Sequence, residues 1–363
     1  MLIFLHESLT SDLNLLKDEA VWQFDDILLL HSKFLHYVAA TKKTALLILR
    51  GLDGRLSSRS KETLNLISSQ SSDSTVLLHK SCLYVEIRKR DLAGLTIESD
   101  ESLTKWVCDL SCAVKWLSQQ SKIIGEHLTD VGAFCAAGKH YAVINNFNPR
   151  MQTSVAELTG GSGNAPLVLK KRISDGFAPV LCVIDSDKYS PLSGGSASIS
   201  KCQEIVDKNK GIFRFHPLIE RELENIVPLD FLRQGVLRLN LSKDRDSILN
   251  RVDILTSVNN ESSDIYRYVD VKFGTCKSWI VSKGVEKFYE KEPIRYSCHC
   301  RADCEGFISP PLFEDVLFET VEYFENSSDK IYRELSIDKV GQSWINLGLV
   351  VFYMALSNNI RTT

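Results

Sequence analysis

The feature that most constrains this chain is an apolar run, Val180–Ile184, that ends in two aspartates, Asp185 and Asp187. A short apolar run between polar residues is typical of a buried strand in a parallel sheet. Because side chains alternate along a strand, we expect both aspartates to point to one side at its carboxyl end, where open α/β sheets bind ligands. Two neighbouring carboxylates repel each other unless a divalent cation lies between them. The alternative interpretation is a solvated junction between strand and loop.

Other acidic residues follow predicted elements in the same region. Residues 122–126 form a second short apolar run that ends in Glu126, and the helix predicted after it carries Asp130 four residues later. Downstream, the segment 215–228 contains three glutamates. The first two motifs are about 60 residues apart, which leaves room for one or two βα units. The sequence therefore predicts that these acids gather at one edge of a sheet.

This order of motifs resembles the Toprim fold of topoisomerases, bacterial primases and nucleases of the OLD (overcoming lysogenization defect) family. The family pattern is Glu-Gly-x-x-Asp, a glycine-containing segment and then Asp-x-Asp. Here the glycine precedes Glu126, and His127 takes its usual place. The segment 221–225, Arg-Glu-Leu-Glu-Asn, is similar to one that follows Asp-x-Asp in OLD-type proteins. The resemblance covers residues 118–235, about a third of the chain.

The resemblance implies a two-metal phosphodiesterase in which carboxylates hold Mg²⁺ or Mn²⁺ about 3.5–4 Å apart. Asp185 and Asp187 would be metal ligands, and Glu126 a ligand or general base. The remaining expected site residues complete the second metal's shell (Asp130 and Glu222, with Glu224 as the alternative) or neutralise charge on the reacting phosphate (Lys188).

A glycine-rich turn, Gly160-Gly161-Ser162-Gly163, lies between the two acidic motifs. Pro166 shortly after it favours a helix start there, because proline is common in the first turn of a helix. A glycine turn before a helix N-terminus can bind phosphate, so all four turn residues are phosphate-binding candidates.

Composition sets the outer limits. The 363 residues suggest two or three domains, and the net charge of −3 does not indicate a large basic surface, although 88–90 and 170–172 are local basic clusters. We expect no targeting segment at Met1–Leu5, and the longest apolar stretch, 347–356, is too short to span a bilayer and is expected to be a buried helix. Ten scattered cysteines suit free thiols in a cytoplasmic protein.

One cysteine cluster raises the question of zinc. Cys298, Cys300 and Cys304, with Cys276 upstream, offer four thiols. Their spacing departs from paired Cys-x2-Cys knuckles, so we expect no zinc here and Mg²⁺ or Mn²⁺ at the carboxylates as the functional metal.

The expected fold class is α/β, with a Toprim-like, mostly parallel core at 118–238, an α+β region at 1–117 and a mainly helical region at 239–363. In the first region, 45–49, 75–78 and 82–87 are predicted strands, and 106–117 is a predicted helix.

The function predicted from this pattern is a metal-dependent nuclease acting on DNA or RNA, an effector of anti-phage defence in a bacterial cytoplasm. A non-catalytic scaffold with a degenerate Toprim core is the alternative, favoured by His127 and the low net charge. Primase-like nucleotidyl transfer ranks third. We expect a nucleic-acid partner and no membrane association, and leave open a regulatory partner protein and self-association.

Overall fold

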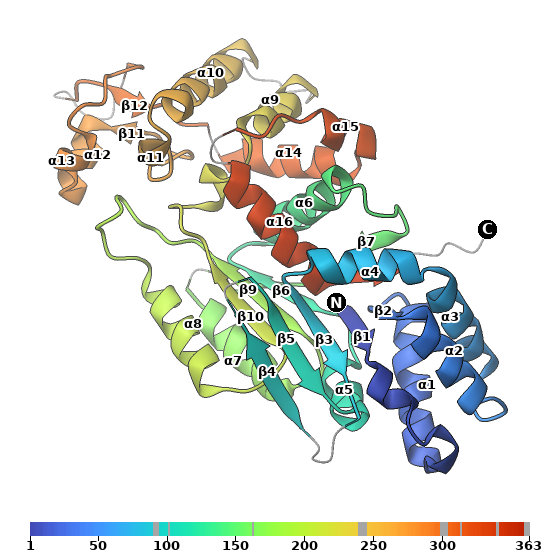
Figure 1. The fold of residues 1–363 in the computed structure, drawn as a ribbon. Helices are drawn as coiled ribbons and strands as arrows, with labels where there is room; N and C mark the ends of the chain where they lie inside the picture. Colours follow the sequence, from blue (N-terminus) through green and yellow to red (C-terminus); the bar gives the residue numbers. More distant parts are fainter. Residues whose placement is uncertain are drawn as a thin grey trace.

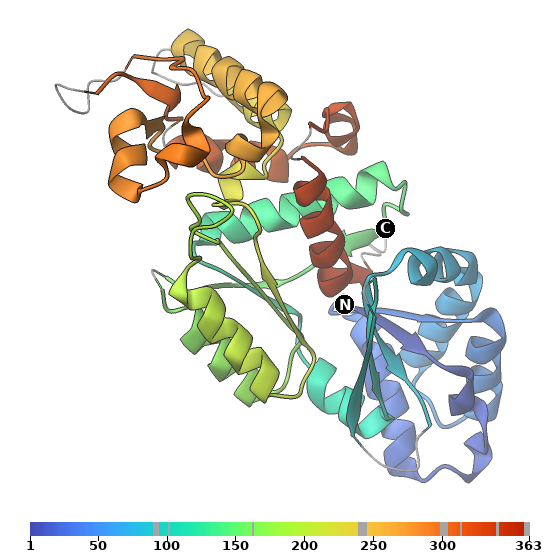
Figure 2. The same ribbon diagram turned by 60° about the vertical axis from the view of Figure 1, so that its left-hand side comes forward.

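The computed structural model describes residues 1–89, 94–100, 102–161, 163–238, 245–297, 304–312, 314–338 and 341–358. Two separate sheets, each with its own helices, lie below a helical C-terminal region, and helix α16 runs between them (Figures 1 and 2). The chain is thus α/β, as the sequence predicts.

The N-terminal sheet has five strands in the order β2-β1-β3-β5-β4, and only the edge strand β4 is antiparallel. Its strands are β1 (Leu2–Leu5), β2 (Tyr37–Ala40), β3 (Leu83–Ile87), β4 (Leu95–Ser99) and β5 (Thr104–Cys108). Its helices are η1 (Glu7–Thr10), η2 (Leu13–Leu15), α1 (Asp18–Ser32), α2 (Lys42–Gly51), α3 (Ser58–Ser69), α4 (Ser71–Lys80) and α5 (Leu110–Leu117). Parallel strands joined by helices make this region α/β in arrangement, so the expected α+β organisation is wrong.

Two of the strands predicted in this region are helices. Residues 45–49 lie in α2 and residues 75–78 in α4, whereas 82–87 does contain β3. The apolar run of α2 buries a single stripe, Ala45 and Ile48, and the helix is started by the Thr41 side chain, which accepts a hydrogen bond from the Thr44 amide. The predicted helix 106–117 begins only at Leu110, because Trp106 belongs to β5.

The second sheet is fully parallel, in the order β10-β9-β6-β8. Its strands are β6 (Lys122–Gly125), β8 (Ala156–Thr159), β9 (Val180–Ile184) and β10 (Phe213–Pro217). Helices α7 (Ala165–Asp175) and α8 (Ala197–Lys208) contribute to the core on the face of Val180, Cys182 and Ile184. Helix α6 (Leu128–Ile144) shares the core of the opposite face with Leu181 and Val183. All five residues of β9 are buried, as expected for a central parallel strand.

The C-terminal region is mainly helical, as the sequence predicts. It contains η3 (Leu223–Asn225), α9 (Leu229–Arg238), α10 (Arg245–Glu261), α11 (Ser263–Tyr266), α12 (Lys277–Lys283), α13 (Glu286–Tyr289), α14 (Glu314–Glu325) and α15 (Asp329–Glu334), with a small ladder of β11 (Thr275–Cys276) and β12 (Phe307–Ser309).

The last elements return to the core. The predicted buried helix at 347–356 corresponds to α16 (Gly341–Ala355), which packs along α6. Strand β13 (Leu356–Asn358) then pairs with β7 (Met151–Thr153). The stretch 239–363 therefore does not stand apart as a domain, because its end completes the core of the preceding region. Within the described residues, none of the helices has the length and apolarity needed to cross a bilayer.

Candidate functional site

The candidate site lies at the carboxyl ends of β6 and β9. These strands are parallel neighbours with Ile124 opposite Cys182, so they end side by side, and Glu126 and Asp185 follow them directly. Burial and the nearby Asp187 and Asp130 carboxylates raise the pKa of Glu126. The two acidic motifs thus meet at one sheet edge, as the sequence predicts.

The two aspartates do not lie on the strand. Strand β9 ends at Ile184, and Asp187 has a left-handed backbone with φ of 55°. Aspartate is one of the few non-glycine residues that adopt this conformation readily. The turn is fixed because the Asp187 amide donates to the Arg221 carbonyl (2.9 Å) and the Ser186 hydroxyl to the Glu220 carbonyl (2.6 Å). The expected strand alternation is therefore wrong, and the turn, not the pleat, aims these carboxylates.

Asp185 is the centre of the acidic cluster, which we define as Glu126, Asp130, Asp185, Glu222 and Glu224. Burial raises the pKa of Asp185 well above its usual value, and the four other members raise it further. One Asp185 oxygen, Oδ1, accepts a hydrogen bond from the Leu223 amide at 3.0 Å. That bond ties the turn after β9 to η3, which carries both glutamates.

The glutamates of η3 have oxygen atoms with no partner. Burial raises the pKa of Glu222 to about 7 although Arg221 opposes the shift, and burial also raises the pKa of Glu224. The Oε2 atoms of both side chains are buried without a hydrogen-bond partner. Buried, unpaired carboxylate oxygens are costly, so these two atoms point to a ligand that would contact them.

Arg221 fixes the position of Glu222. Its Nε donates to Glu222 Oε1 at 2.9 Å and its Nη2 to Asp270 Oδ2 at 2.8 Å. The guanidinium also lies over the rings of Tyr189 and Trp279, 5.0 and 5.1 Å from their centroids. The sequence motif drew attention to this arginine only by resemblance, and nothing in the sequence indicated its partners.

Lys272 is the functional candidate that the sequence did not reveal. Its Nζ lies 3.1 Å from Glu224 Oε1, and the Glu224, Glu222 and Asp185 carboxylates raise its pKa. It arrives from a turn far along the chain from both motifs, so no local pattern marks it. Lys188, the cation expected from the sequence, forms no ion pair with any described residue.

The unusual first motif starts a helix. His127 is the residue before α6, and Asp130 Oδ2 accepts a hydrogen bond from the His127 amide at 2.7 Å. A Cβ atom at Gly125 would lie 3.1–3.2 Å from Val131, Phe134 and the His127 carbonyl, so a larger residue there would need these neighbours to shift by a few tenths of an ångström. The His127 side chain is exposed, which explains why a large residue is accepted there.

The glycine-rich turn serves the fold. The amides of Gly160 and Gly161 donate to the carbonyls of Gly125 and Glu126, at 2.7 and 3.0 Å. These two N–H groups are therefore committed to the end of β6 and are not free to bind a phosphate as predicted. Helix α7 does begin beside Pro166, as the sequence indicates. Of the other two candidates, Gly163 has a positive φ of 84°, and Ser162 lies outside the described residues.

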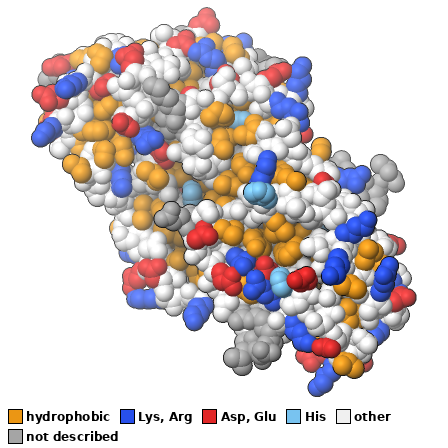
Figure 3. All heavy atoms as spheres, viewed as in Figure 1, with side chains coloured by type: hydrophobic (Ala, Val, Ile, Leu, Met, Phe, Trp, Pro, Cys, Tyr) orange, Lys and Arg blue, Asp and Glu red, His pale blue; other side chains and the backbone are white. Residues whose placement is uncertain are grey.

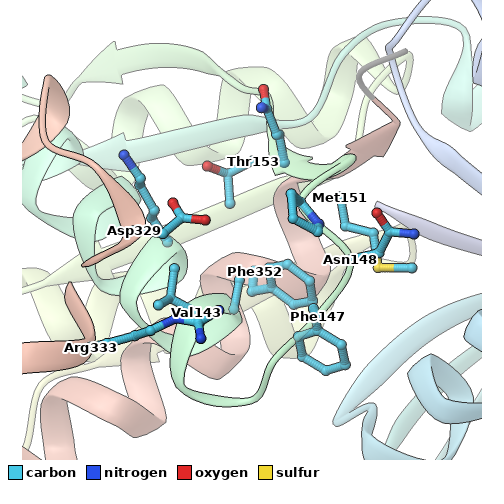
Figure 4. Close-up of a pocket in the computed structure, with 12 residues that line it drawn as sticks. Val143, Phe147, Asn148, Met151, Thr153, Asp329, Arg333 and Phe352 are labelled. Carbon is cyan, nitrogen blue, oxygen red and sulfur yellow. The ribbon is translucent and has the colours of Figure 1, made fainter. Parts of the chain in front are cut away.

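A cavity of about 320 Å³ opens at the acidic cluster. Its lining comes from α6, η3, the Lys272 turn and α14, and consists of His127, Thr129, Asp130, Glu224, Lys272, Leu317 and Phe318. A second cavity, of about 270 Å³, lies near the other end of α6, where Asp329 and Arg333 face Phe147, Asn148 and Met151 (Figure 4). It contains no member of the acidic cluster.

The donor set suits a hard divalent cation, which prefers carboxylate oxygens. The unpartnered Oε2 atoms and the raised carboxylate pKa values are consistent with a bound divalent cation. Lys272 already contributes one positive charge to the site. Within the described residues, no group of three or more His, Cys, Asp or Glu side chains is arranged to hold a metal ion. A Mg²⁺ ion bound here would therefore have few protein ligands, and water, several molecules of which Mg²⁺ usually keeps, would complete its coordination.

The cysteine cluster is only partly described. Cys298 and Cys300 lie outside the described residues. Cys276 contacts the Ser278 hydroxyl at 3.3 Å, and the Cys304 thiol donates to the Gly306 carbonyl at 3.9 Å.

Comparison of the chain with protein-family models, curated proteins and solved structures finds no match.

Proposed function

We propose that this protein is a Mg²⁺- or Mn²⁺-dependent nuclease that hydrolyses phosphodiester bonds at the acidic cluster on a Toprim-like sheet. The observation that carries the proposal is the convergence of five acids at the carboxyl ends of two parallel strands, with two buried carboxylate oxygens unpartnered. Carboxylates with raised pKa values beside a cavity mark a candidate functional site, and Asp130 and Glu224 line the cavity here.

The acidic cluster and its neighbours Asp187 and Lys272 have distinct roles in this proposal. Asp185, Asp187, Glu126, Asp130 and Glu224 would hold the cations, which supply an activated water and neutralise charge on the leaving oxygen. Glu222, which Arg221 holds in position, would complete the shell of the second cation, as the family resemblance implies. The Lys272 ammonium, beside Glu224, would attract the phosphate and lower the cost of its negative charge.

The test uses plasmid DNA and transfer RNA as substrates, each with Mg²⁺, Mn²⁺ or EDTA. We expect cleavage of at least one substrate with metal, none with EDTA, and loss of at least 100-fold in Asp185→Asn. Glu290→Gln is the matched control, because Glu290 is an exposed acid outside the cluster. Cleavage that persists unchanged in Asp185→Asn would contradict the proposal.

The biological role follows only from the OLD-type resemblance, which supports an effector of anti-phage defence in a bacterial cytoplasm. Plaque counts on cells producing the wild-type chain or Asp185→Asn would test this role. Equal counts for the two would contradict it.

A specific observation favours the second candidate, a non-catalytic scaffold. Lys272 and Arg221 already neutralise part of the cluster, and the described residues contain no ready metal-binding group. A scaffold would show neither cleavage nor a thermal shift with Mn²⁺, whereas the nuclease should show both.

A further inference from the structure

Exposed hydrophobic rings border the acidic cluster. Phe318 on α14 is 54% exposed and lines the same cavity as Asp130, Glu224 and Lys272. Phe273, the residue after Lys272, is 67% exposed. Single exposed apolar residues are common on protein surfaces, but here one exposed phenylalanine lines the polar cavity and a second follows a cavity-lining residue in the chain, which points to a surface that a ligand covers.

The turn that carries Phe273 is built to be rigid. The Phe273 amide donates to Asp270 Oδ1 at 2.7 Å, and the Asp270 amide donates to Thr275 Oγ1 at 2.7 Å. The other oxygen of Asp270 is held by Arg221. Gly274 has a φ of 80°, and a Cβ atom there would lie 2.8 Å from the Phe307 ring. The backbone of Phe273 is thus held in a fixed position, and its ring is exposed to solvent. Arg221, which also positions Glu222, is one of the residues that hold this turn.

The charges at the site argue against a ligand held mainly by its phosphates. Duplex binding depends on many Lys and Arg contacts, whereas this chain has a net charge of −3. Acidic and basic side chains are interspersed on the face shown in Figure 3, with no extended basic area. Lys272, the cation in the cavity, is already paired with Glu224. Stacking on aromatic rings adds affinity that does not depend on phosphate charge, and it tolerates any base sequence.

We infer that Phe318 and Phe273 form a base-stacking rim, and that the substrates are single-stranded or locally unpaired nucleic acids. This inference rests on the proposed nuclease function. An unpaired base that stacks on Phe318 would bring its backbone over Asp130, Glu224 and Lys272, where the cavity opens. A duplex keeps its bases stacked on one another and cannot offer their faces to these rings.

The test compares three 12-nucleotide DNA substrates in Mn²⁺: a single strand, the same strand with abasic sites at its central positions, and the duplex. Wild-type protein should cleave the single strand at least 10-fold faster than the other two. Phe318→Ala and Phe273→Ala should each reduce that preference about 10-fold, and Phe318→Trp should retain it. Phe177→Ala is the matched control, because Phe177 is 49% exposed but lies in neither the cavity nor the Lys272 turn.

Binding of the same labelled strands to Asp185→Asn, followed by fluorescence anisotropy in EDTA, separates the two proposals. Cleavage of base-bearing and abasic strands at equal rates would overturn the stacking rim and leave the nuclease intact. Absence of cleavage on all three DNA substrates, on plasmid DNA and on transfer RNA would overturn the nuclease. The binding measurement would then decide the stacking rim. Tighter binding of base-bearing than of abasic strands, lost in Phe318→Ala, would support the rim, and equal binding would overturn it.

Discussion

At the scale of the residue, the acidic cluster contains more negative charge than the fold neutralises. Lys272 pairs with Glu224 and Arg221 with Glu222, yet the pKa values of Glu222 and Glu224 remain raised. Asp185 forms no ion pair with any described residue, and burial and the four other carboxylates of the cluster raise its pKa. A fold under selection for stability alone would replace such groups, so their presence points to a function that uses their charge.

Asp185→Asn should make the metal-free protein more stable. The substitution removes one charge from the cluster, and an asparagine Oδ1 can still accept the hydrogen bond from the Leu223 amide. We expect the Tm in EDTA at pH 8 to rise by about 1–2 °C, which corresponds to roughly 1 kcal/mol for a chain of 363 residues. Mn²⁺ should raise the Tm of the wild-type protein and leave that of the variant nearly unchanged. A lower Tm for the variant in EDTA would mean that Asp185 is structural.

Glu222 should make the metal-free protein less stable as the pH rises. Its folded-state pKa of about 7 is above the unfolded value of 4.5, so the folded state binds the proton more tightly. The resulting stabilisation is complete below about pH 4.5 and is lost as the pH rises through about 7. The buried histidines His31, His140 and His216 have lowered pKa values and act in the opposite direction below pH 6.5.

Because the histidines also change stability with pH, the effect of Glu222 is isolated by comparing the wild-type protein with a Glu222 variant at each pH. Thermal melts of wild type and Glu222→Gln in EDTA from pH 4.5 to 8 should differ most at pH 8, where the variant is the more stable. A difference that does not change with pH would show that Glu222 does not titrate in this range.

At the scale of the element, short turns rather than long helices position the acidic residues and Lys272. The 3-10 turn η3 is held by Asn225, whose Nδ2 donates to the carbonyls of Tyr266 and Val269 at 2.7 and 3.0 Å. The turn after Asp270 is held by Arg221. These contacts join segments that lie about 45 residues apart, which is why the sequence indicated the acids but not the elements that hold them.

Arg221→Lys should destabilise the protein although it keeps the charge. Lysine cannot bridge Glu222 and Asp270 in the same fork geometry or lie flat over Tyr189 and Trp279. We expect a loss of about 2–4 kcal/mol in the free energy of unfolding, measured by urea denaturation. Arg55→Lys, at an exposed pair with Asp18, is the control and should change stability by less than about 1 kcal/mol. Equal effects of the two substitutions would contradict a positioning role for Arg221.

The sequence predicted elements well where burial leaves one interpretation. The parallel strands β6 and β9 lie where the sequence placed them, and the predicted buried stretch 347–356 lies mostly in α16, which begins six residues earlier, at Gly341. The strands predicted at 45–49 and 75–78 are wrong, because a short apolar run of four or five residues fits a strand or one stripe of a helix equally well. The sequence also placed Asp185 and Asp187 on a pleat, since a left-handed aspartate leaves no trace in composition.

At the scale of the whole molecule, α16 links the two halves of the fold. It packs on α6, contacts β1 and β3 of the N-terminal sheet and leads into β13 beside β7. Its neighbour α6 starts at the acidic cluster with His127 and Asp130. The position of these two residues therefore depends on α16, a helix about 200 residues later in the chain. For this reason, the domain boundary predicted at 238/239 does not separate the site from the C-terminal region.

Gly348→Ala should test this dependence. A Cβ atom at Gly348 would lie 2.4 Å from the carbonyl oxygen of Ala137, so α16 must move away from α6 to accept it. Overpacking of this kind costs about 1–3 kcal/mol, and we expect a Tm lower by about 1–4 °C together with a smaller stabilisation by Mn²⁺, because α6 carries Asp130. Gly194→Ala is the matched control, since no atom lies within 4 Å of the added Cβ. If the two substitutions give equal melting temperatures and equal responses to Mn²⁺, the contact between α6 and α16 does not govern the site.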